Sequence, residues 1–339
     1  MRRENYVTLL DVNYLPQLLA LRTSLHRHSG NFRLWVICAD ELVYDFLTQA
    51  QLQGVKAMRL ADFETPELLK VKLERAPYEY YWTLTPFLFD FVFKLDSRIG
   101  RVTYLDADLW FRAAPDSIFE SFQESKKSVL ITAHAFSEDR KTAVAFGRFN
   151  VQFLTMERIG SHAVKQWWQE RCLEWCFARL EEGRYGDQKY LDKFPELFPD
   201  ETWVAEPAMR FQGPWNANRF VSKEAITYHF HSLRLLGRHR LKLYNDTWII
   251  PSDHKRNTYL PYVSDFGDAM LFIHSQNRLM AKQIARDQAN VKTVPQKREL
   301  GRTAGFRVSL RLLVNFLPAF RSSYKNVRII GFPFTPSRK

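Results

Sequence analysis

The chain has 339 residues, of which 46% are hydrophobic and 15% aromatic, and its formal net charge at pH 7 is +12. This composition excludes a mainly disordered protein and suffices for one large α/β domain or two smaller ones. No run of 18 uncharged apolar residues occurs and the first residues contain no secretory signal, so the sequence predicts neither a transmembrane helix nor export.

The first 105 residues alternate between strand and helix patterns. Short apolar runs predict strands over residues 6–10, 32–39, 55–60 and 101–105. Apolar residues at helical spacing predict helices over residues 14–28, 41–53 and 80–95. This alternation predicts a largely parallel sheet with helices on both faces, where ligands bind beyond the carboxyl ends of the strands. Asp11, Asp40 and Asp106 each follow a strand directly and are expected at that edge.

The second half of the chain continues this pattern less regularly. Residues 129–133 read as a strand, and residues 145–156 hold one or two strands. Ser161 is expected to cap a helix that runs to residue 180, with Gly183 ending it. Cys172 and Cys176 fall in this helix, where core packing is the expected role, and sparse free cysteines fit a reducing compartment.

The predicted strand 101–105 ends in two carboxylates, Asp106 and Asp108, spaced i, i+2. On an extended chain this spacing puts both side chains on one face. Two carboxylates this close repel each other unless a cation lies between them. Because Mg²⁺ is held by one or two carboxylates plus substrate phosphates, the pair predicts a site for a metal ion and a diphosphate.

Together with this pair, residues 8–14 (Thr-Leu-Leu-Asp-Val-Asn-Tyr) resemble the opening motif of the nucleotide-diphospho-sugar glycosyltransferases with the GT-A fold. The resemblance is strongest to glycosyltransferase family 8 and related bacterial polysaccharide enzymes, and it covers residues 5–235. It implies a GT-A domain over residues 1–280 and a basic extension over 281–339. It further implies that Asp11 and Asn13 contact the uracil and ribose of a UDP-sugar, with Tyr14 near the base.

The same resemblance implies roles for residues later in the chain. Asp108 would bind Mn²⁺ or Mg²⁺, and Asp106 would bind the metal, the ribose hydroxyl, or both. Asn150 and Gln152 would contact the donor sugar, although Gln152 stands where the family commonly has Gly or Ser. Asp187, followed by Gln188, would lie closest to the reacting carbon as the catalytic pair.

Histidine residues near position 230 complete the implied metal site. Residues 226–230 have strand character, so His229 and His231 are expected to point the same way. The resemblance implies that one of them is the third metal ligand, with His231 slightly favoured. It also implies that Arg234 and Arg238 hold the diphosphate, and that Thr85 or Thr83 lines the uridine site.

The resulting expectation is a metal-dependent enzyme that moves a hexose-type sugar from a UDP-sugar to a hydroxyl of a glycan or glycolipid, with retention of configuration. Two alternatives stay open. A nucleotidyltransferase or nucleotide-sugar hydrolase shares the metal–diphosphate chemistry, although the first strand is not followed by a Gly-rich basic loop. A non-catalytic nucleotide-sugar-binding protein would not need Asp187 or the histidines.

The positive charge lies almost entirely in the C-terminal tail. Residues 282–339 hold 13 Lys and Arg against two acidic residues, a net charge of +11, which leaves +1 for residues 1–281. Residues 306–320 interleave arginines with apolar residues, a pattern typical of a segment at an anionic membrane surface. We therefore expect a cytoplasmic enzyme at the inner face of a bacterial membrane, acting in surface polysaccharide or lipopolysaccharide synthesis. The alternative is a tail that packs back onto the domain. Nucleic-acid binding is not expected, because the basic residues are confined to the tail.

Overall fold

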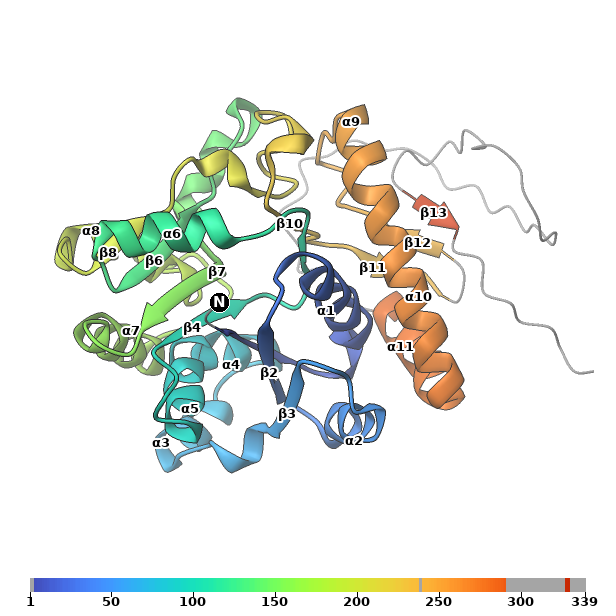
Figure 1. Cartoon of the computed structure of the whole chain (residues 1–339), viewed down its shortest axis with the longest axis horizontal. Coiled ribbons are helices and arrows are strands. Elements are labelled where there is room, and N and C mark those ends of the chain that lie inside the picture. The colour runs from blue at the N-terminus through green and yellow to red at the C-terminus, as the bar shows by residue number, and fades with distance from the viewer. Residues whose placement is uncertain (1–2, 238–239, 291–326, 330–339) are drawn as a thin grey trace, which may run out of the picture.

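A computed structural model describes residues 3–237, 240–290 and 327–329, and its centre is a seven-stranded sheet (Figure 1). The strands of this sheet are β1 (Glu4–Leu10), β2 (Phe32–Cys38), β3 (Val55–Arg59), β4 (Arg101–Leu105), β6 (Val129–Ala133), β7 (Phe149–Glu157) and β8 (Thr202–Val204). Their order across the sheet is β3-β2-β1-β4-β7-β6-β8. Only β7 runs antiparallel to its neighbours, so the carboxyl ends of β1, β2, β4 and β6 meet at one edge. This confirms the predicted, largely parallel α/β sheet.

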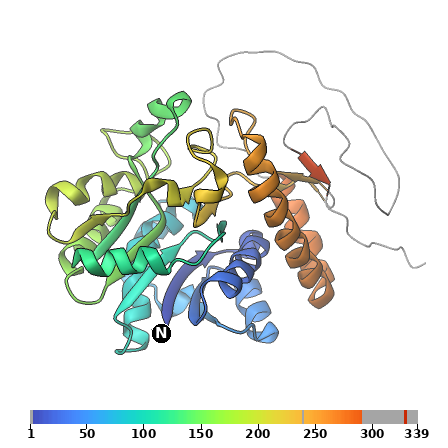
Figure 2. The same cartoon turned by 45° about the horizontal axis from the view of Figure 1, so that its top comes forward.

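Helices cover both faces of the sheet, as the alternating pattern predicts. One apolar core lies between the sheet and the helices α1 (Leu15–His28), α2 (Glu41–Ala50), α6 (Asp116–Ser125), α10 (Leu260–Gln276) and α11 (Arg278–Asn290). A second core lies under α3 (Pro66–Lys72), α4 (Pro77–Leu84), α5 (Leu88–Leu95), α7 (His162–Glu174) and α8 (Phe194–Leu197). In both views α10 and α11 form a layer beside α1 (Figures 1 and 2).

Two small sheets extend the central one. The first contains β5 (Leu109–Phe111), β9 (Phe211–Gln212) and β10 (Thr227–His229), with β10 in the middle. The second contains β11 (Arg234–Leu235), β12 (Arg240–Lys242) and β13 (Val327–Ile329), with β12 in the middle. A short helix, α9 (Ser252–His254), leads through a π-helical turn into α10. In the first small sheet, β5, which follows β4 in the chain, pairs with β10, which ends at His229. This pairing positions the candidate site.

Two predicted helices differ from the observed ones. The helix expected over residues 80–95 is two helices, α4 and α5, separated by a 3-10 turn at Thr85–Phe87. Pro86 explains the break, since it lacks the amide hydrogen that a continuous helix needs. The helix expected over residues 161–180 ends at Glu174, where Trp175 is extended with φ −157°. Ser161 occupies the N-cap position as expected, but its hydroxyl makes no capping hydrogen bond and donates instead to the carbonyl of Glu157 at 2.5 Å.

The described residues of the C-terminal region pack against the rest of the domain. The expected boundary between residues 280 and 281 falls inside α11, which packs against α10 and β11. The basic amphipathic segment 306–320 lies outside the described residues. Strand β13 pairs antiparallel with β12. Within the described part of the chain, no helix combines the length and the hydropathy needed to span a bilayer.

Candidate active site

Strand pairing brings Asp106, Asp108 and His229 together at the carboxyl edge of the sheet. Asp106 follows β4 directly, and Asp108 immediately precedes β5. β5 pairs antiparallel with β10 in a register that sets Leu109 opposite His229. The amide of Phe230 donates to the carbonyl of Asp108 at 2.9 Å, which fixes the two segments side by side. The pairing of β5 with β10 thus places an imidazole from a distant segment beside the carboxylate pair.

The three side chains form a compact set of candidate ligands. One ligand atom from each of Asp106, Asp108 and His229 lies within 4.8 Å of the others. His229 Nε2 is 2.9 Å from Asp108 Oδ1 and 3.7 Å from Asp106 Oδ2. The hydroxyl of Tyr104 donates to Asp106 Oδ1 at 2.7 Å and so orients that carboxylate. Two carboxylate oxygens and one imidazole nitrogen are a suitable donor set for Mn²⁺ or Mg²⁺.

Burial and mutual charge perturb all three groups. Their side chains are 21%, 13% and 8% exposed for Asp106, Asp108 and His229. Burial raises the pKa of Asp106, with the nearby Asp108 adding to the effect. Burial also opposes ionisation of Asp108, but the adjacent His229 outweighs it and lowers that pKa. Burial alone would lower the pKa of His229, and the two carboxylates instead raise it. The cluster is therefore suited to a positive charge between the two carboxylates.

Asp187 lies near this triad, directed inward by a glycine turn. Gly186 has φ +51°, and a Cβ there would lie 3.1 Å from the ring of Trp82, so the turn requires glycine. The backbone carbonyl of Asp187 accepts a hydrogen bond from Trp168 Nε1 on α7 at 3.0 Å. The Asp187 residue is only 3% exposed, and its Oδ2 has no hydrogen-bond partner among the described residues. A buried carboxylate oxygen without a partner is costly, which makes Asp187 a candidate functional residue.

The protonation of Asp187 is set mainly by its burial. Burial raises its pKa to about 7, the hydrogen bond from Thr85 lowers it, and the charge of Asp106 raises it further. Thr85, expected at the uridine, is itself buried in the 3-10 turn and faces Asp187. Gln188, the second expected catalytic residue, is half-buried and donates through Nε2 to the carbonyl of Phe146 at 3.2 Å.

The residues expected at the donor sugar lie on β7, next to the end of β4. The carbonyl of Gln152 accepts a hydrogen bond from the amide of Asp106 at 3.1 Å. Gln152 is fully buried, and neither atom of its side-chain amide has a partner among the described residues. Asn150 Oδ1 accepts from the amide of Gln152 at 2.8 Å, and Asn150 Nδ2 lies 3.0 Å from His134 Nε2. Asn150 therefore holds the local backbone, while Gln152 keeps both amide atoms unpaired.

His134 was not anticipated, although a sequence signal for it exists. It directly follows β6, whose carboxyl end shares the edge with Asp11, Asp40 and Asp106. Its ring is buried against Phe136 and Trp215, and burial lowers its pKa to about 3. The strand-end reasoning that identified the three aspartates therefore also applies to this histidine.

The residues expected at the nucleotide lie at the carboxyl end of β1. Asp11 Oδ1 accepts from the amide of Asn13 at 2.9 Å, which forms the 3-10 turn Val12–Tyr14. The side-chain oxygen of Asn13 is buried without a partner among the described residues, and Tyr14 is 45% exposed. Gln288 of α11 donates to the carbonyl of Asn13 and accepts from the amide of Leu235 at 2.8 Å. The sequence does not reveal this contact, because Gln288 is 275 residues away from Asn13.

Of the remaining expected residues, His231 lies next to the triad. His231 is exposed, and its ring lies 5.9 Å from His229, 6.5 Å from Trp215 and 6.2 Å from Trp248. The compact triad thus contains His229 and does not include His231. Arg234 begins β11 and is half-buried, whereas Arg238 lies outside the described residues.

Known proteins resemble this chain in fold and in sequence, although no protein-family model matches it. Glycosyltransferase GlyE from Streptococcus pneumoniae TIGR4 superposes with a TM-score of 0.49 at 17% identity, over 87% of this chain and 66% of that one. Mouse xyloside xylosyltransferase 1 superposes with a TM-score of 0.44 at 14% identity, over 68% and 98%.

Two relatives are similar in sequence, and both come from Bacillus subtilis (strain 168). The uncharacterized protein YfnF is 30% identical over 279 residues, which are 77% of this chain and 89% of that protein. The uncharacterized protein YfnD is 29% identical over 283 residues, which are 76% and 87% of the two chains. The matched stretches span most of all three proteins.

Proposed function

The chain belongs to the same family as YfnF of Bacillus subtilis, and we propose that it is a metal-dependent glycosyltransferase that uses a UDP-sugar. The single observation that carries this proposal is the triad of Asp106, Asp108 and His229 at the carboxyl edge of the parallel sheet. That edge is where ligands bind in sheets of this kind. The buried carboxylate of Asp187 nearby adds a group suited to chemistry.

In this proposal the carboxylates and His229 bind Mn²⁺ or Mg²⁺, while the turn at Asp11 and Asn13 receives the nucleoside, with Tyr14 beside it. His231 remains a second candidate for the third ligand position, and Arg234 is assigned to the diphosphate. When bound, the ion would neutralise charge on the leaving diphosphate and act as a Lewis acid. Tyr104 holds Asp106 in orientation for this task.

Gln152 and Asp187 are proposed to act on the donor sugar. The Gln152 amide has a free donor and a free acceptor, which suits it to pair with sugar hydroxyls. Asp187, with Gln188 beside it, would stabilise positive charge that develops at the anomeric carbon. We propose retention of configuration, with the acceptor hydroxyl attacking from the face that the diphosphate leaves and passing its proton to the leaving phosphate. The acceptor is a hydroxyl of a glycan or glycolipid.

The proposed setting is synthesis of a bacterial surface polysaccharide, with the basic extension 281–339 at the inner face of the membrane. Its charge of +11 supports an anionic surface as partner. The pairing of β13 with β12 supports the other arrangement, in which part of the tail returns to the body. A comparison of sedimentation with anionic and neutral vesicles distinguishes the two.

Calorimetry of UDP binding with and without Mn²⁺ tests the proposed metal site. We expect Mn²⁺ to strengthen UDP binding to the wild type, and Asp108→Ala to abolish that gain without unfolding the protein, since β4 and β5 are held by burial. The control Asp268→Ala removes an exposed carboxylate on α10 and should bind like the wild type. Equal UDP affinity with and without Mn²⁺ in the wild type would contradict the assignment.

A further inference from the structure

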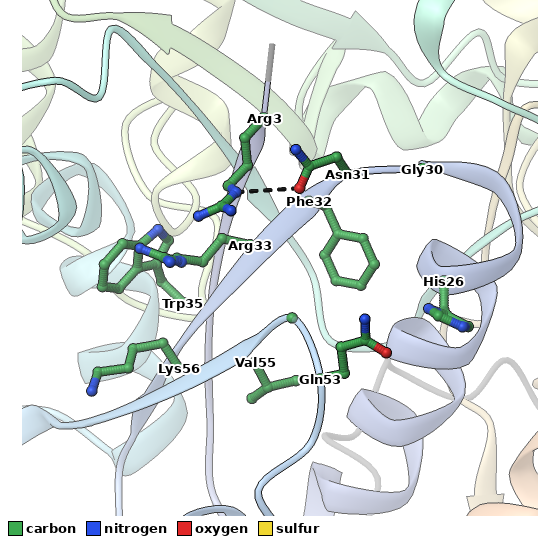
Figure 3. Close-up of a pocket in the computed structure, with 11 residues that line it drawn as sticks. Arg3, His26, Gly30, Asn31, Phe32, Arg33, Trp35, Gln53, Val55 and Lys56 are labelled. Atoms are coloured by element: carbon green, nitrogen blue, oxygen red, sulfur yellow. Dashed lines mark hydrogen bonds between the residues drawn. The ribbon is translucent and has the colours of Figure 1, made fainter. Parts of the chain in front are cut away.

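A cavity opens at the amino end of the central sheet, at the edge opposite the triad. Its volume is about 450 Å³, and it lies between the residue just before β1, the last turn of α1, the first residues of β2 and β3, and the loops that precede these two strands. Figure 3 shows the side chains of Arg3, Arg33 and Lys56 on the Trp35 side of this cavity, with His26 beyond Phe32. Volumes of this size are typical of small-molecule sites.

The charge of this cavity is unbalanced. Three cationic side chains and His26 line it, and no acidic residue does. Among the described residues, none of these four groups has a carboxylate within 4.0 Å. Arg33 also interacts electrostatically with Asp96. That carboxylate is already bound by Arg98, through hydrogen bonds of 2.8 and 2.9 Å. Because residues 1–281 as a whole carry only +1, this local excess does not follow from the general composition.

Local contacts orient two of the cationic groups, Arg3 and Arg33. Arg3 Nε donates to Asn31 Oδ1 at 3.2 Å, and the guanidinium of Arg33 lies 5.3 Å from the ring centroid of Trp35. Gly54 forms part of the rim with φ +82°, and a Cβ there would lie 3.0 Å from the ring of Phe32. Side chains that are oriented before binding lose less entropy when a ligand arrives.

We propose that this cavity is a binding site for a phosphate-bearing ligand, separate from the donor site. Arg forks and Lys ammonium groups are the side chains that recognise phosphate oxygens. The strands rise about 3.3 Å per residue, so the seven residues of β1 separate the two edges by roughly 20 Å. The ligand is a phosphorylated small molecule or a phospholipid headgroup, which share this chemistry. The inference is independent of the transferase proposal.

The test measures phosphate binding in EDTA, so that no metal supports binding at the triad. Inorganic pyrophosphate is titrated by calorimetry at low ionic strength into the full chain, the double variant Arg33→Gln/Lys56→Gln, and the control Lys223→Gln/Arg256→Gln. The control removes one lysine and one arginine that are exposed and distant in sequence from the cavity. The same proteins are sedimented with phosphatidic acid vesicles and with phosphatidylcholine vesicles.

We expect the cavity double variant to lose at least about tenfold in pyrophosphate affinity, because it removes two charge-assisted contacts, while the control stays within about twofold. Lys56→Glu, at an exposed position, should also weaken binding and guards against misfolding of the double variant. If the double variant binds phosphatidic acid vesicles more weakly than the control, which carries the same basic tail, the natural phosphate is a lipid headgroup. If it loses pyrophosphate affinity but binds these vesicles as tightly as the control, the phosphate is soluble. Equal pyrophosphate binding by wild type and double variant, or none by the wild type, would overturn the proposal.

Discussion

Asp187→Asn should stabilise the metal-free protein, and the gain should grow with pH. Burial raises the pKa of Asp187 from the ordinary 3.8 to about 7. The folded state therefore binds this proton more tightly than the unfolded chain, so the wild type loses stability as pH rises through about 4 to 7. The full difference corresponds to about 4 kcal/mol, of which about 2–3 kcal/mol appears between pH 5 and pH 8. Asparagine has nearly the same shape and no charge to desolvate.

Urea unfolding at pH 5 and pH 8, with EDTA present, measures this effect. The difference in unfolding free energy between Asp187→Asn and wild type should increase by about 2–3 kcal/mol from the lower to the higher pH. Asp45→Asn, at an exposed position on α2, is the matched control and should show little change because water already surrounds that carboxylate. A pH-independent difference for Asp187→Asn would refute the view that this carboxylate is held ionised at a cost to the fold.

The same variant should separate binding from turnover. UDP affinity should be preserved, while sugar transfer falls by at least about 10²-fold, the size typical of losing one positioned charged group. A variant that is more stable but less active would indicate that the buried carboxylate is kept for function. If UDP-sugar affinity instead falls in step with the rate, Asp187 is a binding residue.

Three further predictions concern Tyr104, Gln288 and the C-terminal tail. Tyr104→Phe removes the hydroxyl that orients Asp106, so the Mn²⁺ affinity of the UDP complex should fall about 10- to 100-fold in a metal titration, and an unchanged affinity would exclude this orienting role. Gln288→Ala leaves the buried amide of Leu235 without its partner, so urea unfolding should show a loss of about 1–3 kcal/mol, accompanied by weaker UDP binding. Deleting residues 300–339 should weaken salt-sensitive sedimentation with anionic vesicles while UDP binding persists, and identical sedimentation before and after deletion would contradict a membrane role for the tail.

The sequence was sufficient to predict six of the seven strands of the central sheet, because these are apolar runs separated by helical patterns, but it did not predict the short edge strand β8. It also predicted that Asp11, Asp40 and Asp106 share one edge, since parallel strands end there. It did not predict β5, whose three buried residues depend on pairing with β10 more than a hundred residues later. The break at Pro86 could have been read from the chain, because proline interrupts the helical hydrogen bonds.

For the site, sequence reasoning identified the carboxylate pair but left the choice of histidine open. Alternation along a strand predicts that His229 and His231 point the same way, yet β10 ends at His229 and only that ring joins the triad. The hydrogen bond between Thr85 and Asp187 and the contact of Gln288 with Asn13 both depend on packing between distant segments. Neither relation leaves a periodic signal in the sequence.

The central claim is that this chain transfers a sugar from a nucleotide in a metal-dependent reaction. Mass spectrometry of reactions with UDP-, GDP- and CMP-sugars, each with Mn²⁺ or with EDTA, tests it most directly. We predict that a UDP-sugar alone is consumed with a glycan or glycolipid acceptor, that EDTA stops the reaction, and that Asp108→Ala is inactive while Asp268→Ala is not. Release of free sugar with no acceptor product would indicate a hydrolase, and consumption of a donor in EDTA at the same rate would contradict the account.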